Sequence, residues 1–345
     1  MLKEILESRG VPALKTKEEM MEILHREEYG YMPPKPDKFS WSEKIDIEHF
    51  CAGKATLKRV TLTSEIYGES FSFPIYAAVP KKEGKYPFFI YISFRNQETD
   101  RYMPVEEIID NGFAVLSFCY EDVSNDCNDF EDGLAGIITR KLGRGATTPG
   151  KLAMWAWAAQ RVMDYAESID KLDLSLATVC GHSRLGKTAL LCAATDDRFF
   201  LGYSNNSGCS GAAIARETKG ETVKDICQTR FPYWFCENYF KYIDNEDAMP
   251  FDQHYLIASI APRRVYVASA REDAWADPEN EFLGCVGASD IYAQYGKEGF
   301  ITPEKFPEVG DVFHDGMIGY HLRAGTHYFG REDWQKVMAY IKRHM

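Results

Sequence analysis

The segment 177–194 restricts the fold more than any other part of the chain. A short apolar run, Ala177–Cys180, leads directly into Gly181-His182-Ser183, and a helical pattern follows from Lys187 to Ala194. A buried strand that ends in Gly-x-Ser and turns sharply into a helix is typical of a nucleophile elbow. The same stretch also matches G-x-x-x-x-G-K-[ST], the phosphate-binding loop of nucleotide hydrolases. Both interpretations require a layered α/β fold, but they predict different chemistry.

Apolar runs alternate with helical patterns along most of the chain. Further strands are expected at 55–80, 88–92, 113–118, 200–205 and 264–268, and further helices at 15–28, 104–111, 151–168 and 332–343. Apolar strands bounded by helices indicate a buried, mostly parallel sheet. We therefore predict an α/β-hydrolase fold, with a mostly parallel central sheet flanked by helices in a three-layer sandwich.

Composition limits the number of domains and the kinds of partner. The chain has 345 residues, of which 45% are hydrophobic, enough for one sizeable core. We expect a single domain over 1–345, with 1–50 as an N-terminal helical and extended arm in which Pro33-Pro34-Lys35-Pro36 ends the helix. The net charge of −12 repels phosphate backbones, so no nucleic-acid partner is expected. The sequence leaves the oligomeric state open.

Cysteine usage and hydropathy bear on compartment, metal and membrane. The nine cysteines form no C-x-x-C pair, so we expect no metal site and no cofactor. No apolar run approaches the roughly 18 residues that span a membrane, so no membrane partner is expected. Residues Met1–Glu7 lack the apolar stretch of a signal peptide. Together with free thiols, this predicts a cytoplasmic location.

The sequence around the motif favours the elbow over the phosphate loop. A phosphate loop follows an early strand and needs a second strand that ends in Asp to hold Mg²⁺. Here at least four predicted strands come first, and the next strand, Phe200–Ser204, is followed by Asn205-Asn206. The bulky side chains of His182, Arg184 and Leu185 would also crowd a loop that wraps a phosphate.

A serine hydrolase of this fold has its triad in the order Ser, acid, His, and the chain supplies that order. Ser183 is followed by Asp273, directly after the predicted strand 265–270, and then by His327 before the last helix. His327 would take the serine proton, and Asp273 would stabilise the imidazolium. The backbone N–H and guanidinium of Arg184 would donate to the oxyanion.

Alternatives to two of these residues stay open. Three other carboxyl groups near Asp273 are candidate acids: Glu272, Asp277 and Glu279. Two other histidines are near His327 in sequence, His314 and His321, and we interpret His321 as a structural hydrogen-bonding residue. His182, beside the nucleophile, is expected to pack under the elbow. In the commonest elbow the second glycine stands at the place of Leu185, whereas here it is Gly186.

The elbow resembles a known family. Gly181-His182-Ser183-Arg184-Leu185-Gly186-Lys187 is similar to the Gly-x-Ser-Arg-x-Gly-Lys signature of the glucuronoyl esterases, carbohydrate esterase family 15, especially of their bacterial relatives. Similarity extends over about 88–340. Further matches in the same order are Trp155-Ala156-Trp157, Ser204-Asn205-Asn206-Ser207-Gly208, Phe251-Asp252-Gln253-His254, Ala261-Pro262-Arg263, Trp275-Ala276-Asp277-Pro278, Gly325-Thr326-His327 and Asp333-Trp334.

The resemblance implies an α/β-hydrolase that cleaves esters between 4-O-methylglucuronate on xylan and lignin alcohols, without a metal or other cofactor. Carried over by motif, Ser183 is the nucleophile, Arg184 an oxyanion-hole donor and His327 the base. Lys187 is implied to donate hydrogen bonds to sugar hydroxyls, and Trp275 to form a wall against the sugar.

Two positions depart from the family pattern. Fungal members have a glutamate acid where this chain has Asn206, whereas Asp273 matches the alternative acid site of bacterial members. The family also has a Gln and a Glu that bind the uronate, but the segment 229–233 before Trp234 contains no acid.

These observations predict a serine esterase that hydrolyses a small carbohydrate ester through an acyl-enzyme, in the manner of a glucuronoyl esterase. An alternative is an acetyl xylan esterase that removes O-acetyl groups from oligosaccharides. An alternative of another class is a catalytically silent sugar-binding protein with a hydrolase fold, because an amide at Asn206 cannot stabilise an imidazolium as a carboxylate does.

Overall fold

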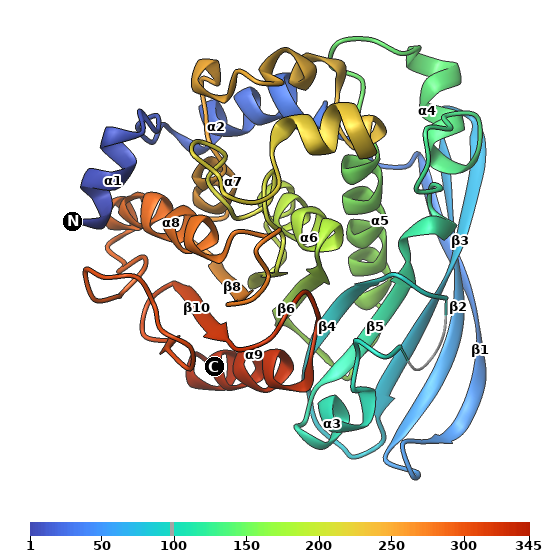
Figure 1. Ribbon diagram of the computed structural model, residues 1–345. Coiled ribbons are helices and arrows are strands. Elements are labelled where there is room, and N and C mark those ends of the chain that lie inside the picture. Colours follow the sequence, from blue (N-terminus) through green and yellow to red (C-terminus); the bar gives the residue numbers. More distant parts are fainter. Residues whose placement is uncertain (97–99) are drawn as a thin grey trace.

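The structure is a computed structural model that describes residues 1–96 and 100–345. Its centre is a ten-stranded sheet in the order β1-β2-β3-β5-β4-β6-β7-β8-β10-β9 (Figure 1). The strands are β1 (Lys38–Phe50), β2 (Ala55–Ile66), β3 (Glu69–Pro80), β4 (Tyr86–Ser93), β5 (Ala114–Cys119), β6 (Leu172–His182), β7 (Leu201–Asn205), β8 (Arg264–Ala270), β9 (Val312–Phe313) and β10 (Ile318–Arg323).

The sheet combines a parallel half with an antiparallel edge. Strands β5, β4, β6, β7, β8 and β10 are parallel to one another. The long strands β1, β2 and β3 are antiparallel and form the twisted ribbon on the right of Figure 1. Because the parallel strands all end at the same edge, the loops that follow β6, β7, β8 and β10 meet there.

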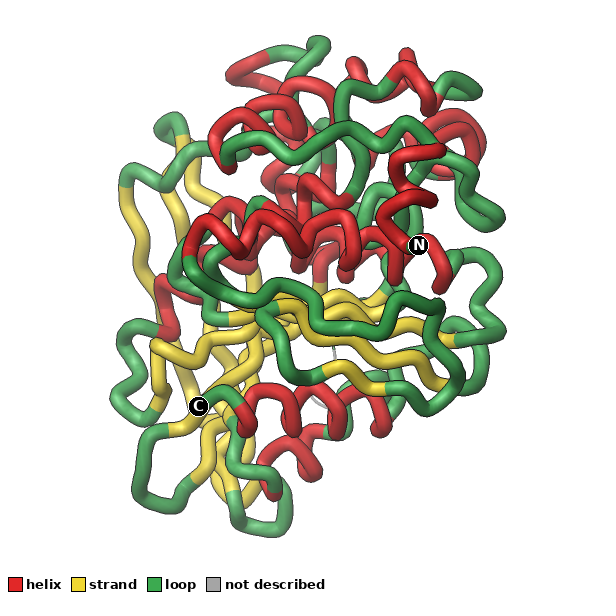
Figure 2. Tube along the Cα trace, turned by 90° about the vertical axis from the view of Figure 1, so that its left-hand side faces the viewer, coloured by secondary structure: helices red, strands yellow, loops and turns green. Residues whose placement is uncertain are grey.

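Helices cover both faces of the sheet (Figure 2). They are α1 (Leu2–Ser8), α2 (Lys17–Leu24), α3 (Val105–Asp110), α4 (Gly133–Leu142), α5 (Lys151–Ala166), α6 (Arg184–Thr195), α7 (His254–Ala258), α8 (Pro278–Ala288) and α9 (Arg331–Arg343). Short helical turns occupy His25–Tyr29, Tyr120–Asp122, Asp225–Arg230, Pro232–Trp234, Glu237–Tyr242, Glu246–Ala248 and Ser289–Tyr295. The buried apolar residues fall into two clusters, one of which contains the buried side chains of α5, α6 and α8 and the other those of α3 and α9. The predicted three-layer α/β-hydrolase sandwich is confirmed.

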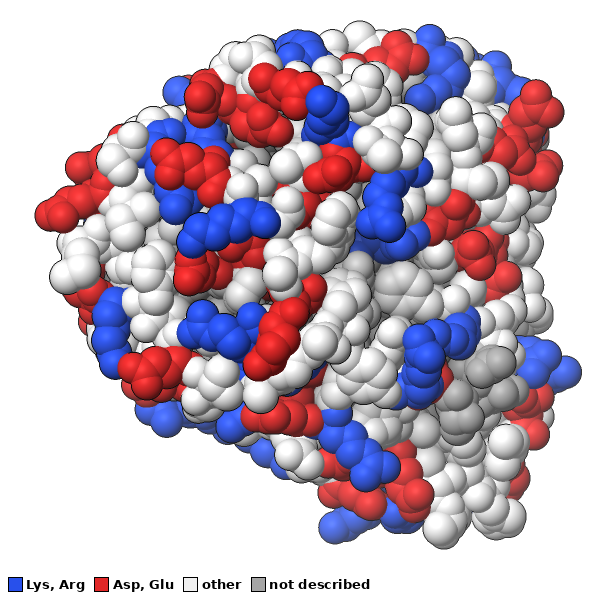
Figure 3. Space-filling view, in the orientation of Figure 1, with Lys and Arg blue, Asp and Glu red and all other residues white. Residues whose placement is uncertain are grey.

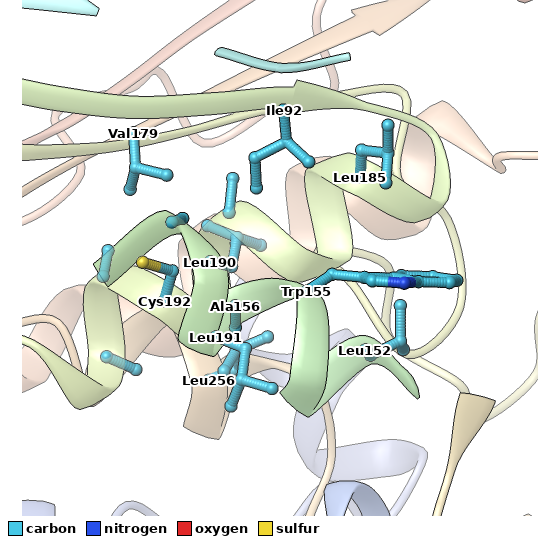
Figure 4. Packing of buried hydrophobic residues seen from close by; sticks show 14 of the residues in the cluster. Ile92, Leu152, Trp155, Ala156, Val179, Leu185, Leu190, Leu191, Cys192 and Leu256 are labelled. Atoms are coloured by element: carbon cyan, nitrogen blue, oxygen red, sulfur yellow. The ribbon is translucent and has the colours of Figure 1, made fainter. Parts of the chain in front are cut away.

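The larger cluster fixes the helix that begins at the elbow. In Figure 4, Val179 of β6 and Ile92 of β4 lie against Leu190 of α6, and Trp155 of α5 lies on the other side of that helix. All these side chains are fully buried. Burying a large apolar side chain contributes about 1.5–3 kcal/mol, so this packing holds the amino end of α6 firmly at the sheet edge.

The N-terminal arm contains more regular structure than the sequence indicates. Helix α2 begins with a capping box, in which Thr16 and Glu19 bond each other's backbone N–H groups. Residues 38–50, predicted only as part of an extended arm, form the edge strand β1, which pairs along its length with β2. Most side chains of β1 are exposed on both faces, so the strand has no apolar alternation to reveal it.

Candidate active site

The elbow is a strained turn between β6 and α6. Ser183 has φ 58° and ψ −129°, a left-handed conformation that non-glycine residues rarely adopt. Its backbone N–H donates to the carbonyl of Asn205 at 2.8 Å. A Cβ at Gly181 would lie 2.2 Å from the carbonyl oxygen of Leu185, and one at Gly186 would lie 3.0 Å from the Ser204 hydroxyl. Both glycines therefore allow the helix to approach the strands, and the shifted second glycine, Gly186, faces β7.

Two of the other predicted residues meet beside this turn. Asp273 follows β8, and its Oδ2 lies 2.6 Å from Nδ1 of His327, which is in the loop between β10 and α9. His327 is 37% exposed, whereas the Asp273 side chain is only 3% exposed. His327 and Ser183 line the same cavity of about 250 Å³, together with Arg184. The structure thus brings together the four residues that the sequence analysis placed at the reaction centre.

The competing residues bind elsewhere in the described chain. The Glu272 carboxylate accepts the backbone N–H of Gly325. Asp277 caps the first turn of α8, and Glu279 pairs with Lys219 at 2.8 Å. His314 and His321 both contact the hydroxyl of Tyr266. Among the four candidate carboxyl groups, Asp273 is the one that contacts His327.

A polar shell keeps Asp273 ionised although it is buried. The Nδ2 of Asn206 donates to Asp273 Oδ2 at 2.7 Å, and the backbone N–H of Ala276 donates to Oδ1 at 3.3 Å. Burial acts to raise the pKa of Asp273, but the bond to His327 and the amide of Asn206 hold it below its ordinary value. The amide of Asn206 therefore supports the acid and does not replace it.

A second buried carboxyl group holds the turn that presents Asn206. Glu281 of α8 accepts the backbone N–H groups of Ser207 at 2.7 Å and Gly208 at 3.1 Å. Its other oxygen accepts the Ser269 hydroxyl at 2.6 Å. Complete burial raises the pKa of Glu281 to about 8, because none of its partners is positively charged.

His182 packs under the elbow, as predicted. It is buried, and its Nδ1 lies 2.7 Å from Oδ1 of Asn205. The centroids of the His182 and His327 rings are 4.4 Å apart. Burial, reinforced by the neighbouring His327, lowers the pKa of His182 to about 3. His182 is therefore neutral at ordinary pH and does not repel a positive charge on His327.

Two charged residues fix the loop of His327. The Arg323 guanidinium at the end of β10 donates to the carbonyls of Thr326 and Tyr328, on either side of His327. Asp333 of α9 holds that guanidinium through Nε at 2.9 and 3.0 Å. The orientation of the imidazole thus depends on a buried ion pair outside the cavity.

Arg184 lies in an aromatic and acidic setting. Its guanidinium carbon is 4.8 Å from the ring centroid of Phe231 and 4.7 Å from that of Trp234. One terminal nitrogen donates to the carboxylate of Asp126. Its buried Nε has no protein acceptor within the described residues.

The ammonium group of Lys187, which was predicted to donate to sugar hydroxyls, already has three acceptors within the protein. Lys187 is 2% exposed, and its ammonium donates to Glu221 Oε2 and the Ser207 carbonyl at 2.6 Å each and to the Cys209 carbonyl. The indole N–H of Trp275 donates to the other oxygen of Glu221 at 3.2 Å. A sugar hydroxyl would have to replace one of the acceptors of Lys187, so its role as a sugar donor stays a prediction.

The surface around the site carries charges of both signs. In Figure 3, acidic and basic side chains are interspersed, and an uncharged, hollowed area lies between basic side chains right of the centre. Among the described residues, no three His, Cys, Asp or Glu side chains are grouped to hold a metal ion. No helix in that part of the chain has the length and hydropathy of a membrane span.

Comparisons with known proteins identify the family. The family model described as "Glucuronyl esterase, fungi" matches residues 62–296. The solved structure of a glucuronoyl esterase from Solibacter usitatus is 32% identical, with a TM-score of 0.86, and the match covers 95% of this chain and 92% of that chain. The chain belongs to the glucuronoyl esterase family.

Curated relatives in the glucuronoyl esterase family are longer than this chain. A carbohydrate esterase of an unknown prokaryotic organism is 41% identical over 246 residues, which are 70% of this chain and 56% of the relative. A 4-O-methyl-glucuronoyl methylesterase of Podospora anserina is 27% identical over 280 residues, 78% of this chain and 53% of the relative. The chain therefore spans about half the length of these relatives.

Sequence reasoning missed three carboxyl groups of this site: Asp126, Glu221 and Glu281. Asp126 lies in the acidic loop that follows β5. Glu221 lies upstream of the segment 229–233, in which the resemblance led us to expect an acid. The sequence signal for both is weak, because many surface loops contain acids and only the fold shows which of them are buried.

Proposed function

We propose that this chain is a serine esterase that hydrolyses a 4-O-methylglucuronoyl ester of a xylan-derived saccharide through an acyl-enzyme. The observation that carries the proposal is the buried Asp273 bonded to His327, which shares a cavity with the strained Ser183. Membership of the glucuronoyl esterase family supports the same reaction. The name of the Podospora anserina relative supports the substrate class.

The geometry suits two-step acyl transfer. Nε2 of His327 takes the proton as Ser183 Oγ attacks the ester carbonyl, and the tetrahedral intermediate forms. The imidazolium then donates that proton to the alcohol oxygen, the C–O bond breaks, and an acyl-enzyme remains. His327 then deprotonates a water molecule, which attacks the acyl carbonyl and forms a second tetrahedral intermediate. As the bond from the acyl carbon to Ser183 Oγ breaks, the imidazolium returns its proton to Oγ, and the uronic acid leaves. Throughout, the Asp273 carboxylate stabilises the imidazolium.

Two groups are placed to stabilise the oxyanion. The backbone N–H of Arg184 lies at the start of α6, where the helix dipole favours negative charge. The guanidinium of Arg184 is the second group, because Arg184 lines the cavity together with Ser183. A donor already held in place stabilises the developing charge without reorganisation.

We propose that the sugar ring lies toward Trp275, which is 40% exposed. Glu221 links Trp275 and Lys187 and so fixes the orientation of the indole edge. A rigid aromatic wall with polar groups at its edge suits a ring that has one apolar face and several hydroxyls. In this arrangement Lys187 acts chiefly by holding Glu221.

The predicted catalytically silent alternative rested on Asn206. Asp273, which is bonded to His327, supplies the carboxylate that Asn206 lacks. This favours an enzyme over a catalytically silent sugar-binding protein. The acetyl xylan esterase alternative uses the same triad and differs only in the acyl group. The cytoplasmic location and the absence of nucleic-acid and membrane partners stay predictions. The oligomeric state stays open.

An ester panel tests the proposal. We expect wild-type protein to release alcohol from methyl 4-O-methylglucuronate faster than acetate from acetylated xylo-oligosaccharides, and Ser183→Ala to lose both activities. A fluorophosphonate probe should label wild type and the control Ser175→Ala, an exposed serine, but not Ser183→Ala. Labelling that survives Ser183→Ala would contradict the esterase proposal. Faster acetate release would replace the uronoyl substrate with the acetyl one.

A further inference from the structure

Asp126 receives hydrogen bonds from an unusual number of separate segments. Its carboxylate accepts the Tyr120 hydroxyl at 2.9 Å, the Trp234 indole N–H at 2.8 Å and the guanidinium of Arg184. Its backbone carbonyl accepts the Tyr233 hydroxyl at 2.7 Å. The carboxylate is 8% exposed. The end of β5, the start of α6 and the turn Pro232–Trp234 are thus joined at one side chain.

These contacts determine where the Arg184 guanidinium can lie. The rings of Phe231 and Trp234 are parallel within 2°, with centroids 3.9 Å apart, and the guanidinium lies near both. Phe94 is on a third side, 5.8 Å away. Because Asp126 binds one terminal nitrogen of Arg184 and also binds Trp234, the cation and its aromatic neighbour share one anchor. Rotation of the guanidinium would break the bond to Asp126 and the contacts with both rings.

We propose that Asp126 is a positioning residue, which holds the Arg184 guanidinium where it donates to the oxyanion of the tetrahedral intermediate. This inference rests on the proposed esterase function and adds a residue to it. A carboxylate close to an oxyanion opposes it by charge, so Asp126 favours catalysis only through the orientation of Arg184. A long arginine side chain that is free to move would have to be ordered in the transition state, whereas a fixed one is already in place.

The inference distinguishes Asp126 from an ordinary loop anchor. Substitution of a residue that only stabilises the loop would lower the melting temperature, and it would change KM as well as kcat. A residue that aims an oxyanion donor changes kcat and leaves KM nearly constant, because the donor is used only in the transition state. It also changes the affinity for tetrahedral adducts of Ser183 by a similar factor.

The first test compares Asp126→Asn with wild type in ester hydrolysis and in inhibition by phenylboronic acid, which forms a tetrahedral adduct with serine. We expect kcat to fall about 10- to 100-fold, somewhat less than the loss of a whole oxyanion donor, with KM within about twofold. The Ki of phenylboronic acid should rise in parallel. The matched control is Asp129→Asn, in the same acidic loop, whose carboxylate accepts only the backbone N–H of Glu131 among the described contacts. It should behave as wild type.

The second test is a double-mutant cycle with Arg184→Ala. If Asp126 acts through Arg184, Asp126→Asn should cause no further loss of kcat in the Arg184→Ala background. A full additional loss in that background would overturn the inference. The residual rate of each variant is compared with that of Ser183→Ala. If Ser183→Ala keeps its activity, the esterase proposal fails. If Ser183→Ala is inactive but the two losses add, only the inference about Asp126 fails.

A third variant applies if Asp126→Asn does not fold, as judged by circular dichroism. Asp126→Glu keeps the charge and all acceptor atoms but moves them by one methylene group. We expect it to lower kcat in the same direction with KM nearly constant. A kcat equal to that of wild type for Asp126→Glu would overturn the inference, because the placement of the carboxylate would then not matter.

Discussion

The chain contains two aspartate–histidine pairs close to each other, and they differ in what surrounds them. His327 and Asp273 are 2.6 Å apart, and the imidazole is 37% exposed at the cavity of Ser183. His321 and Asp333 are 3.0 Å apart, and both side chains are at most 1% exposed. The two pairs have the same functional groups, but only one is accessible to a substrate.

The difference lies in the second nitrogen of each imidazole. Nδ1 of His321 lies 3.0 Å from the Tyr266 hydroxyl, so both of its nitrogens have protein partners. In the described residues, His327 has a bond only from Nδ1, and its Nε2 is available. Asp333 is also shared with Arg323, which holds the loop of His327. The pair of His327 and Asp273 is thus suited to proton transfer. Asp333 of the other pair, through Arg323, fixes the loop that presents His327.

The largest expected effect separates the two pairs by activity. Asp273→Asn should lower kcat by about 10³-fold or more, because an amide cannot stabilise the imidazolium and favours the wrong tautomer. The melting temperature should change little, since Asn keeps the shape of the side chain. The measurement is steady-state hydrolysis of an ester, with thermal unfolding as the control. Activity within tenfold of wild type would mean that Asp273 is not the acid.

The counterpart substitution, Asp333→Asn, should act on stability. It leaves the buried guanidinium of Arg323 without its charge partner, and breaking such a pair lowers the free energy of unfolding by about 3–5 kcal/mol. Urea unfolding followed by tryptophan fluorescence measures the change. If the free energy of unfolding of Asp333→Asn equals that of wild type, the distinction between a structural and a reactive pair fails.

A smaller effect is expected at Asn206, whose side-chain amide donates to Asp273 of the reactive pair. Asn206→Asp places a second carboxylate against Asp273, and repulsion raises the pKa of the carboxyl pair. The acid would then be protonated at a higher pH, so the acid limb of the kcat profile should move to higher pH. Asn206→Ala, which removes the hydrogen bond without adding charge, should move it less. A profile that coincides with wild type for both variants would show that Asn206 does not act on Asp273.

The last expected effect is on the pH dependence of stability, and it concerns Glu281, whose carboxyl group lies behind the Asn206 turn. Its pKa is raised from 4.5 to about 8, so the folded state binds a proton that the unfolded state has lost between those pH values. Stability therefore falls as pH rises through this range, by up to about 1.4 kcal/mol per pH unit from this group. Glu281→Gln should reduce the slope of the free energy of unfolding against pH, measured by urea titration from pH 5 to 8.

A matched variant completes that experiment. Glu279→Gln changes an acid on the same helix, α8, whose carboxylate pairs with Lys219 at the surface. Its slope should equal that of wild type. Glu28, also buried with a pKa of about 8, keeps part of the pH dependence in every variant. An unchanged slope in Glu281→Gln would mean that Glu281 is ionised in the folded protein.

Much of the fold could be predicted because the central strands are buried on both faces. Strands β4, β5, β6, β7 and β8 appear as continuous apolar runs, and helix α5 has a clear periodicity. Three strands, β1, β9 and β10, lack such a signal, and β9 has only two residues. β1 is exposed on both faces, and β10 contains Gly319, His321 and Arg323, whose burial depends on partners in other segments.

The site could be predicted where the sequence order itself carries the information. Ser183, Asp273 and His327 follow the order that the fold requires, and each stands next to a recognisable strand or helix. Asp126, Glu221 and Glu281 have no such marker. Their importance comes from burial beside Arg184, Lys187 and the Asn206 turn, and a one-dimensional pattern does not show which acids the fold will enclose.

The dispersal of the site along the chain has a consequence for synthesis. Ser183 leaves the ribosome well before Asp273, and His327 with its clamp of Arg323 and Asp333 comes in the last segments, β10 and α9. Domains form as the chain emerges from its amino end. Until α9 docks, the nascent chain holds a serine with no base. Chemical reactivity at Ser183 is therefore a reporter of the docking of α9, and a fluorophosphonate pulse during translation would measure when that helix reaches the sheet.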